Sequence, residues 1–161
     1  MKNKFLLEQL VAKTITAPVD LNTAANTGAR VDMKGVKRVT FIAILAAGSS
    51  TTAHTFTLKQ HTVASSGTPA NLSVDNPYYH KIGAATSFTK VDPQGSAAAA
   101  YDLHSLLADS AAIVVFEVLA EQLTEGYRWV SLDTTDSGGA QLGCVIALAD
   151  ADFNPAYDAA V

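Results

Sequence analysis

The sequence contains the three residue types of a nucleophilic catalytic triad, in three separate segments. A histidine, His54, lies in TTAHTF, a carboxylate, Asp102, lies in YDLHSLL, and a serine, Ser137, lies in TTDSGGA. Hydrolysis by such a triad needs the serine hydroxyl beside the imidazole, a carboxylate that orients the imidazole, and backbone N–H groups for the oxyanion. The three segments therefore predict a hydrolase only if the fold brings them together in a cleft.

The DSGG stretch around Ser137 resembles the serine motif of chymotrypsin-like proteases, which also have histidine, aspartate and serine in this chain order. The neighbouring residues differ from that family: Thr135 replaces a glycine, Ala140 a proline, and Thr55 the cysteine beside the histidine. The family has two six-stranded barrels, and 161 residues are too few to form both. A hairpin turn, with Gly138 and Gly139 at positive φ, explains the motif without chemistry. A small serine hydrolase is kept as a remote alternative.

No other residue pattern predicts a cofactor or metal site. The four histidines lack metal-ligand spacing such as HExxH, and a single cysteine, Cys144, can form neither an internal disulfide nor a structural zinc site. Cys144 lies in an apolar run, which favours a buried thiol. Asp133 and Asp136 flank a turn, and capping of that turn is favoured over a calcium site. Glu117 interrupts an apolar strand, which favours an edge position facing solvent or an interface.

Composition and charge favour a protein that binds other proteins. Charged residues make up 16% of the chain, against about 25% in an average soluble domain. Residues 1–38 hold seven bases and three acids, and the remainder holds four bases and twelve acids. This asymmetry predicts either attraction between opposite ends of neighbouring copies or a basic arm and an acidic tail that are each simply solvated. There is no basic stripe with interleaved aromatics, and no segment approaches the roughly 20 apolar residues of a membrane span. The sequence predicts no nucleic acid partner, no membrane partner, and synthesis in a cytoplasm.

The hydrophobic pattern indicates an all-β fold. Residues 36–45 read as a strand in the middle of a sheet, since both of their faces are apolar, and residues 54–62 alternate cleanly. Further strands are expected at 86–91, 111–120, 127–133 and 142–149, with the last three joined by turns of hairpin length. Six to eight strands without alternating helices predict a single β-sandwich or jelly-roll-like domain.

Three regions follow from this pattern. Residues 1–34 are expected to form an N-terminal arm and extended segment, the arm being a short helix or a segment ordered by a partner. Residues 35–150 are expected to form the sandwich, with a long loop region at 64–105, and residues 151–161 a C-terminal tail. The candidate interface residues are apolar and aromatic side chains in the arm, the loop region and the tail. For the two loop tyrosines, the alternative is that their rings fold over the domain's own core. The candidates are Phe5, Leu6, Leu10, Tyr78, Tyr79, Phe153 and Tyr157.

Two short motifs resemble those of small structural proteins in tailed-bacteriophage virions. Val31 to Gly35 leads into the first core strand, and Arg128, Trp129 and Val130 form part of a strand that precedes a final apolar strand. The resemblance covers the two ends of the domain and not residues 64–105. It implies a β-sandwich with an assembly role and no catalysis, of the capsid decoration (cement) type on the virion surface. The implied partners are the major capsid protein and copies of the chain itself, as a homotrimer or another homo-oligomer. A tail or head-tail connector subunit that forms rings is the alternative.

Overall fold

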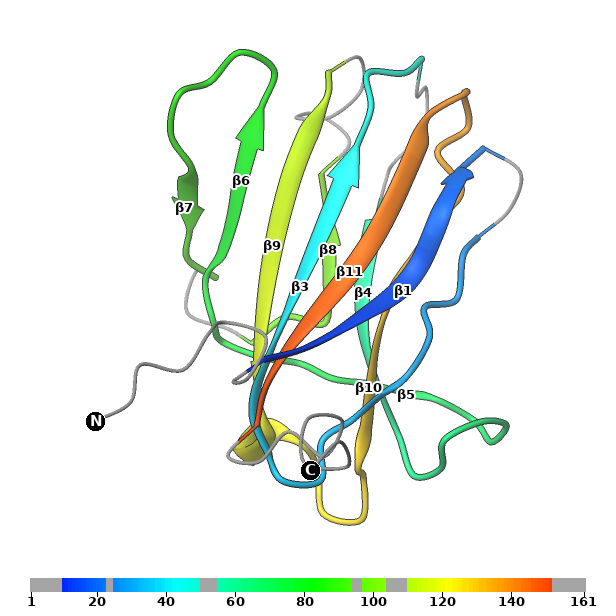
Figure 1. Cartoon of the computed structure of the whole chain (residues 1–161), viewed down its shortest axis with the longest axis vertical. Helices are drawn as coiled ribbons and strands as arrows, with labels where there is room; N and C mark the ends of the chain where they lie inside the picture. The colour runs from blue at the N-terminus through cyan, green and yellow to red at the C-terminus, as the bar shows by residue number, and fades with distance from the viewer. Residues whose placement is uncertain (1–9, 23–24, 50–54, 94–96, 104–109, 152–161) are drawn as a thin grey trace, which may run out of the picture.

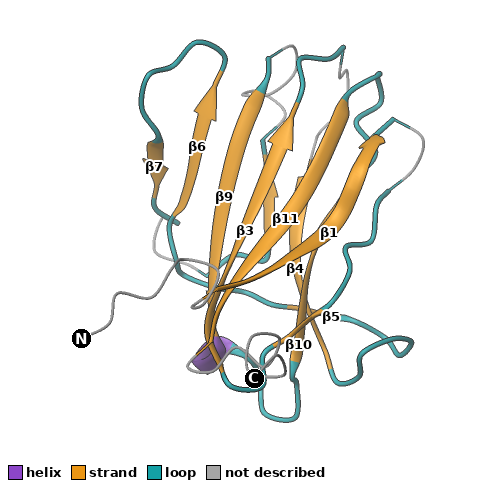
Figure 2. Ribbon diagram, viewed as in Figure 1, coloured by secondary structure: helices purple, strands orange, loops and turns teal. Residues whose placement is uncertain are grey.

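The protein is a β-sandwich of two antiparallel sheets. The computed structural model describes residues 10–22, 25–49, 55–93, 97–103 and 110–151. Figure 1 looks onto a six-stranded sheet that lies in front of a five-stranded one, and Figure 2 shows that strands dominate both layers. Within the described residues the helical content is one 3-10 turn, η2 at Ala120–Gln122. The all-β sandwich predicted from the sequence is confirmed.

The six-stranded sheet has the order β1-β11-β3-β9-β6-β7, and every neighbouring pair is antiparallel. The strand predicted to be central, at residues 36–45, is β3, and it lies between β11 and β9. The bounds of its strands are Leu10–Asp20 for β1, Val36–Leu45 for β3, Tyr78–Ile82 for β6, Thr89–Val91 for β7, Ala112–Leu119 for β9 and Leu142–Ala151 for β11.

The five-stranded sheet has the order β2-β10-β4-β5, and a fifth strand, β8, also pairs with β4. A bidentate ion pair links its β2 edge to the start of β10, because the Arg128 guanidinium donates to both carboxylate oxygens of Asp32. This contact holds the pKa of Asp32 below its usual value. The strands of this sheet are Val31–Asp32 for β2, Thr55–His61 for β4, Ala70–Asn71 for β5, Ala100–Asp102 for β8 and Trp129–Thr134 for β10.

The core lies between the two sheets and follows from the period-two alternation of their strands. Every second residue of β3 points inward and is buried, from Val39 through Phe41 to Leu45, and β9 alternates in the same way. The ring of Phe116 on β9 is at the centre. Its centroid lies 5.6 Å from that of Phe56 on β4 and 5.0 Å from that of Tyr101 on β8, so aromatic contacts join the two sheets.

The structure moves two boundaries that the sequence predicted. Residues 10–20, expected in the arm and extended segment 1–34, form β1, which pairs with β11 from Leu10 opposite Asp150 to Asp20 opposite Leu142. The region 64–105, expected as a long loop with one strand at 86–91, contains β5, β6, β7 and β8, and β7 lies within the expected strand. Strands at the edge of a sheet can be short and weakly patterned, because only one neighbour and one face constrain them. The residues 1–9 and 152–161 lie outside the described part of the chain.

The two predicted hairpins are wrong. β9 belongs to the six-stranded sheet and β10 to the five-stranded one, and β11 returns to the six-stranded sheet, so both connections cross between the layers. Alternation shows which residues of a strand face the core but not which sheet the strand joins. A strand from either layer buries its inner face in the same core, and a short connection therefore fits a hairpin and a crossing equally well.

A further crossing at Gly28 carries the chain from β1 to β2. Its N–H donates to the Asp133 carboxylate on β10 at 3.0 Å, and the next N–H, that of Ala29, donates to the Ile15 carbonyl on β1 at 2.9 Å. A Cβ atom at residue 28 would come within 2.3 Å of the Leu132 carbonyl oxygen and 2.7 Å of Ile15 Cγ2. Only glycine therefore leaves room for the backbone where the chain crosses from one layer to the other.

We expect Gly28→Ala to destabilise the fold. Because the added methyl meets backbone on one side and a buried side chain on the other, the loss in unfolding free energy is expected to be about 3 kcal/mol. Gly35→Ala is the comparison, since its φ is +71° and a Cβ there meets nothing within 4 Å, and its cost is expected to be about 1 kcal/mol of backbone strain. Urea denaturation measures both, and equal midpoints for the two variants would contradict this account of the crossing.

Candidate interaction surface

The outer face of the six-stranded sheet carries a continuous apolar surface. Residues of β3, β9 and β11 that alternate with the buried core positions point away from the core and are partly or fully exposed. Ile44 is 42% exposed and Leu142, at the end of β11, is 62% exposed. Strand pairing aligns six of these side chains in two rows, which we call the outer apolar patch: Cys144, Ile44 and Ile113 in the first row, and Ile146, Ile42 and Val115 in the second.

The patch extends sideways along the same rows. In the second row Thr14 of β1 lies opposite Ile146, and Tyr79 of β6 lies opposite Val115. In the first row Lys81 of β6 lies opposite Ile113. Directly opposed side chains on one face of antiparallel strands are about 5 Å apart, so the rows form an unbroken surface across five strands.

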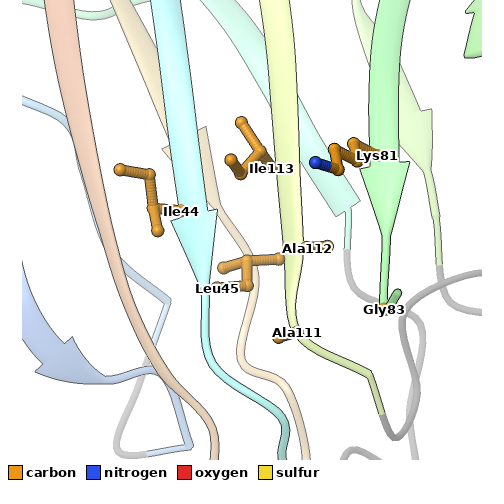
Figure 3. Close-up of a pocket in the computed structure, with 7 residues that line it drawn as sticks. All are labelled: Ile44, Leu45, Lys81, Gly83, Ala111, Ala112 and Ile113. Carbon is orange, nitrogen blue, oxygen red and sulfur yellow. The ribbon is translucent and has the colours of Figure 1, made fainter. Parts of the chain in front are cut away.

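Charged groups lie at two ends of this face and leave its centre uncharged. At one end Arg38 lies 3.8 Å from Glu117 and 3.6 Å from Asp150, and all three side chains are partly exposed. At the other end Lys81 borders a shallow hollow of about 240 Å³ between β3, β9 and β6. Figure 3 shows Ile44, Ile113 and Lys81 on these three neighbouring strands around the hollow.

Two expectations for residues on this face are corrected. Cys144, expected as a buried thiol, is partly exposed within the patch, because the alternation of β11 puts Gly143 and Val145 inward. Glu117, expected at a sheet edge, lies on β9 between β3 and β6, and its carboxylate accepts a hydrogen bond from Thr40 at 3.2 Å. An outward-facing carboxylate is tolerated in a central strand here because Arg38 and Thr40 are its neighbours.

The seven candidate interface residues are not gathered in one place. Tyr78 lies on β6 and its ring stacks on Phe116 at 5.7 Å, so its ring covers the domain's own core, which was the alternative for this residue. Tyr79 points to the other side and extends the outer apolar patch, and Leu10 begins β1 opposite Asp150. The remaining four, Phe5, Leu6, Phe153 and Tyr157, lie outside the described residues.

Ser137 is buried and is engaged within its own turn. Its side chain is 0% exposed, its hydroxyl donates to the Gly139 carbonyl at 2.7 Å, and its N–H donates to the Leu21 carbonyl. Gly138 has the positive φ expected of it, at 66°. Gly139 does not, and it is required because a Cβ there would come within 1.9 Å of a carbonyl oxygen in the loop after β3. The Asp136 carboxylate accepts from the Gly138 N–H at 2.7 Å, which confirms turn capping for this residue, whereas the Asp133 carboxylate accepts from Gly28 and Ser131 instead.

Of the other two residues of the predicted triad, only Asp102 lies in the described part of the chain. Asp102 lies on β8, where it pairs with Thr55, and His54 lies outside the described residues. The Thr55 carbonyl accepts from the Thr135 N–H at 3.0 Å, so this end of β4 is near the serine turn in space. The chain order that suggested a triad thus reflects neighbouring segments of the sandwich, with the serine side chain turned into the protein.

A different histidine, serine and aspartate do meet, on β4 and β10. His61 Nε2 lies 2.9 Å from Ser131 Oγ, and the Ser131 hydroxyl donates to the Asp133 carboxylate at 3.1 Å. The serine is therefore the middle group, its proton points to the carboxylate, and the imidazole must donate from Nε2. A nucleophilic triad needs the imidazole in the middle as the base. His61 is 2% exposed and Ser131 0% exposed, so this cluster is structural.

Sequence reasoning missed both this cluster and the patch as a surface. The cluster had a signal in the alternation of β4 and β10, which puts His61 and Ser131 on the same face of their strands, but the register between the strands is a tertiary property. The patch had a stronger signal, because β3, β9 and β11 are apolar at odd and even positions alike.

Among the described residues, no group of three or more histidine, cysteine, aspartate or glutamate side chains is arranged to hold a metal ion. In the same part of the chain, no helix has the length and apolar character needed to cross a membrane.

Comparison with protein-family models, with curated proteins and with solved structures found no match for this chain.

We expect His61 to make the fold less stable as the pH falls. Burial, and next the nearby positive charge of Arg30, lower the pKa of His61 below its usual 6.5, while Asp133 opposes this shift. The unfolded chain then takes up a proton at a higher pH than the folded chain, so unfolding free energy is lost as the pH falls below about 6.5. His61→Gln keeps a side-chain N–H donor and removes this titration.

Urea denaturation of wild type and His61→Gln at about pH 8 and about pH 5.5 measures the difference. The wild type is expected to lose more unfolding free energy between the two conditions than the variant. Equal losses would show that the folded and unfolded states bind protons equally at this position.

Proposed function

We propose that this chain is a structural protein of a tailed-bacteriophage virion that decorates and stabilises the capsid lattice. On this proposal it is not an enzyme, its location is the capsid surface, and its partners are the major capsid protein and copies of itself. The motifs at Val31 to Gly35 and Arg128 to Val130 support the virion assignment by resemblance.

The outer apolar patch is the observation that carries the assembly role. Exposed apolar area costs free energy in water, and a monomer that is fully soluble by itself has no use for β-branched side chains along the outer face of three central strands. The low charged fraction, 16%, is consistent with a surface that contacts protein. A lattice multiplies many modest contacts, so a small domain suffices to stabilise a shell.

The alternative, a tail or head-tail connector subunit, predicts a different copy number of the chain in each particle. A ring contains a few copies in each particle, whereas decoration of a lattice requires copies in proportion to the major capsid protein. The apolar patch supports assembly in either case, so stoichiometry is the quantity that separates the two.

We expect quantitative mass spectrometry of purified virions to find this chain at a copy number comparable to that of the major capsid protein. Controlled disruption of the particles is expected to leave the chain with the capsid fraction and not with the tails. Absence of the chain from particles would contradict the virion role, and a small number of copies that purifies with tails would favour the connector.

The hydrolase alternative is tested by Ser137→Ala. Because the Ser137 hydroxyl is buried and bonded to Gly139, we expect the variant to lose about 1 kcal/mol of stability and to assemble as the wild type does. Hydrolysis of a small activated ester, compared with that of Ser131→Ala as a second buried serine, is expected to be at background for wild type and both variants. Turnover by the wild type that Ser137→Ala alone removes would contradict a purely structural role.

A further inference from the structure

We infer that the outer apolar patch binds the same patch on a second copy of this chain, so that two sandwiches stack face to face through their six-stranded sheets. The inference rests on the proposed function in one respect, since it takes the patch as a protein-binding surface, and it goes further by naming the partner. Three properties of the patch support a second copy as the occupant: its charge, its shape and its size.

The charge pattern allows the face to meet itself. In a two-fold contact the same surface is presented from both sides, so charges of one sign at its centre would repel. The two central rows carry no charged side chain between Ile146 and Val115 or between Cys144 and Ile113. The charges at the border include both signs, with Arg38 within 4 Å of both Glu117 and Asp150. A partner recognised by opposite charge would instead require a charged centre.

The shape of the face matches another sheet. The patch is formed by regular antiparallel pairs on β11, β3 and β9, with isoleucine and valine at five of its six positions. Side chains of this kind on two sheet faces interdigitate at a sheet separation of about 10 Å, which is how the two layers of a sandwich pack. The hollow beside Ile44 and Lys81 gives a side chain of the second copy a place to insert.

The size of the face is that of a specific interface. Five strands of five to eleven residues, at about 4.8 Å between strands and about 3.4 Å per residue, give the whole outer face, its charged border included, a projected area of about 700 Å². A stable interface buries about 800 Å² of accessible surface on each partner, and the accessible surface of a side-chain layer exceeds its projection. The face therefore suffices for a dimer without a contribution from the chain ends.

The experiment measures the mass of the full chain in solution over a range of concentrations by sedimentation equilibrium. The wild type is expected to be in monomer–dimer equilibrium. Ile44→Lys places a charge at the most exposed position of the patch, and it is expected to raise the dimer dissociation constant at least about tenfold. Thr57→Lys is the matched control, because it puts the same side chain on the outer face of the other sheet, and it is expected to dimerise as the wild type does.

Cys144 reports on the same contact without a change in sequence. A short bismaleimide is expected to link two wild-type chains through Cys144, and Ile44→Lys is expected to remove the product. Cys144→Ser is the reagent control. Circular dichroism and the urea midpoint confirm that Ile44→Lys is folded, and Ile44→Thr, which keeps a β-branched side chain, gives a smaller shift in the same direction if the lysine variant does not fold.

Each other occupant of the patch gives a result that overturns the inference. A wild type that stays monomeric and whose Cys144 resists alkylation would show that another part of the same chain covers the patch. A monomer with a reactive Cys144 that loses capsid binding on Ile44→Lys would show that a shell protein occupies it. A trimer would require a head-to-tail contact and would also overturn a two-fold pairing of the patch.

The experiments distinguish failure of the proposed function from failure of the face-to-face contact. A wild-type dimer that Ile44→Lys dissociates, from a chain that is absent from virions, would uphold the face-to-face contact and reject the decoration role. A chain that is abundant in capsids but is neither a dimer in solution nor cross-linked through Cys144 would uphold the role and reject the contact.

Discussion

The contact of Phe116 with the opposite sheet is the interaction on which the two-layer arrangement depends. The Phe116 ring, on β9, packs against Phe56 and Tyr101 from the five-stranded sheet and against Tyr78 from its own sheet, at centroid distances between 5.0 and 5.7 Å. Each aromatic side chain buries roughly 150 to 250 Å². Because the cluster joins segments far apart in sequence, it forms only when both sheets are in place.

Burial in this cluster also determines how its phenols behave. Desolvation raises the pKa of Tyr101 to about 12, and the Tyr101 hydroxyl donates to the Ala98 carbonyl at 2.9 Å. The phenol therefore remains protonated across the physiological range, and its polar end is satisfied within the fold. The core needs no charged group, which agrees with the low charge of the chain as a whole.

The sequence contained enough information to predict the class of fold and the central strand, but not the partners of each strand. Residues 36–45 are apolar on both faces, and this property belongs to a strand with neighbours on both sides. Residues 127–133 alternate as a strand of either layer would, so their place in the five-stranded sheet depends on pairing with β4 and β2. The edge strand β1 carries a bulge between Thr14 and Thr16, which interrupts the alternation that would have marked it.

Strand pairing also explains why the catalytic residues suggested by the sequence differ from the residues that meet in the structure. Residue types and chain order suggested His54, Asp102 and Ser137, whereas proximity in the fold selects His61, Ser131 and Asp133. Proximity in a sheet depends on register, which local sequence does not fix. In both groups the serine is buried, and its hydroxyl donates a hydrogen bond inside the protein.

The two outer faces of the sandwich differ in chemistry, so the two sides of the molecule are not equivalent. On the five-stranded sheet the crossing segment lies beside β10, where Gly28 donates to Asp133 and Arg30 donates to the carbonyls of Val63 and Ser66 beyond β4. His61 alternates with the core residues of β4, yet it is only 2% exposed. On the six-stranded sheet, Ile42 and Ile44 of β3 point away from the core, and Ile44 is 42% exposed.

A polar cluster is thus buried on one outer face while isoleucine is exposed on the other. Hydrophobic burial alone would favour the reverse, because covering the apolar face releases more free energy than covering a polar one. The arrangement is consistent with a chain that folds with one face closed by its own segments and one face left for another protein. The constraint that makes β3 central, apolar residues on both of its sides, is then the same constraint that makes the outer face apolar.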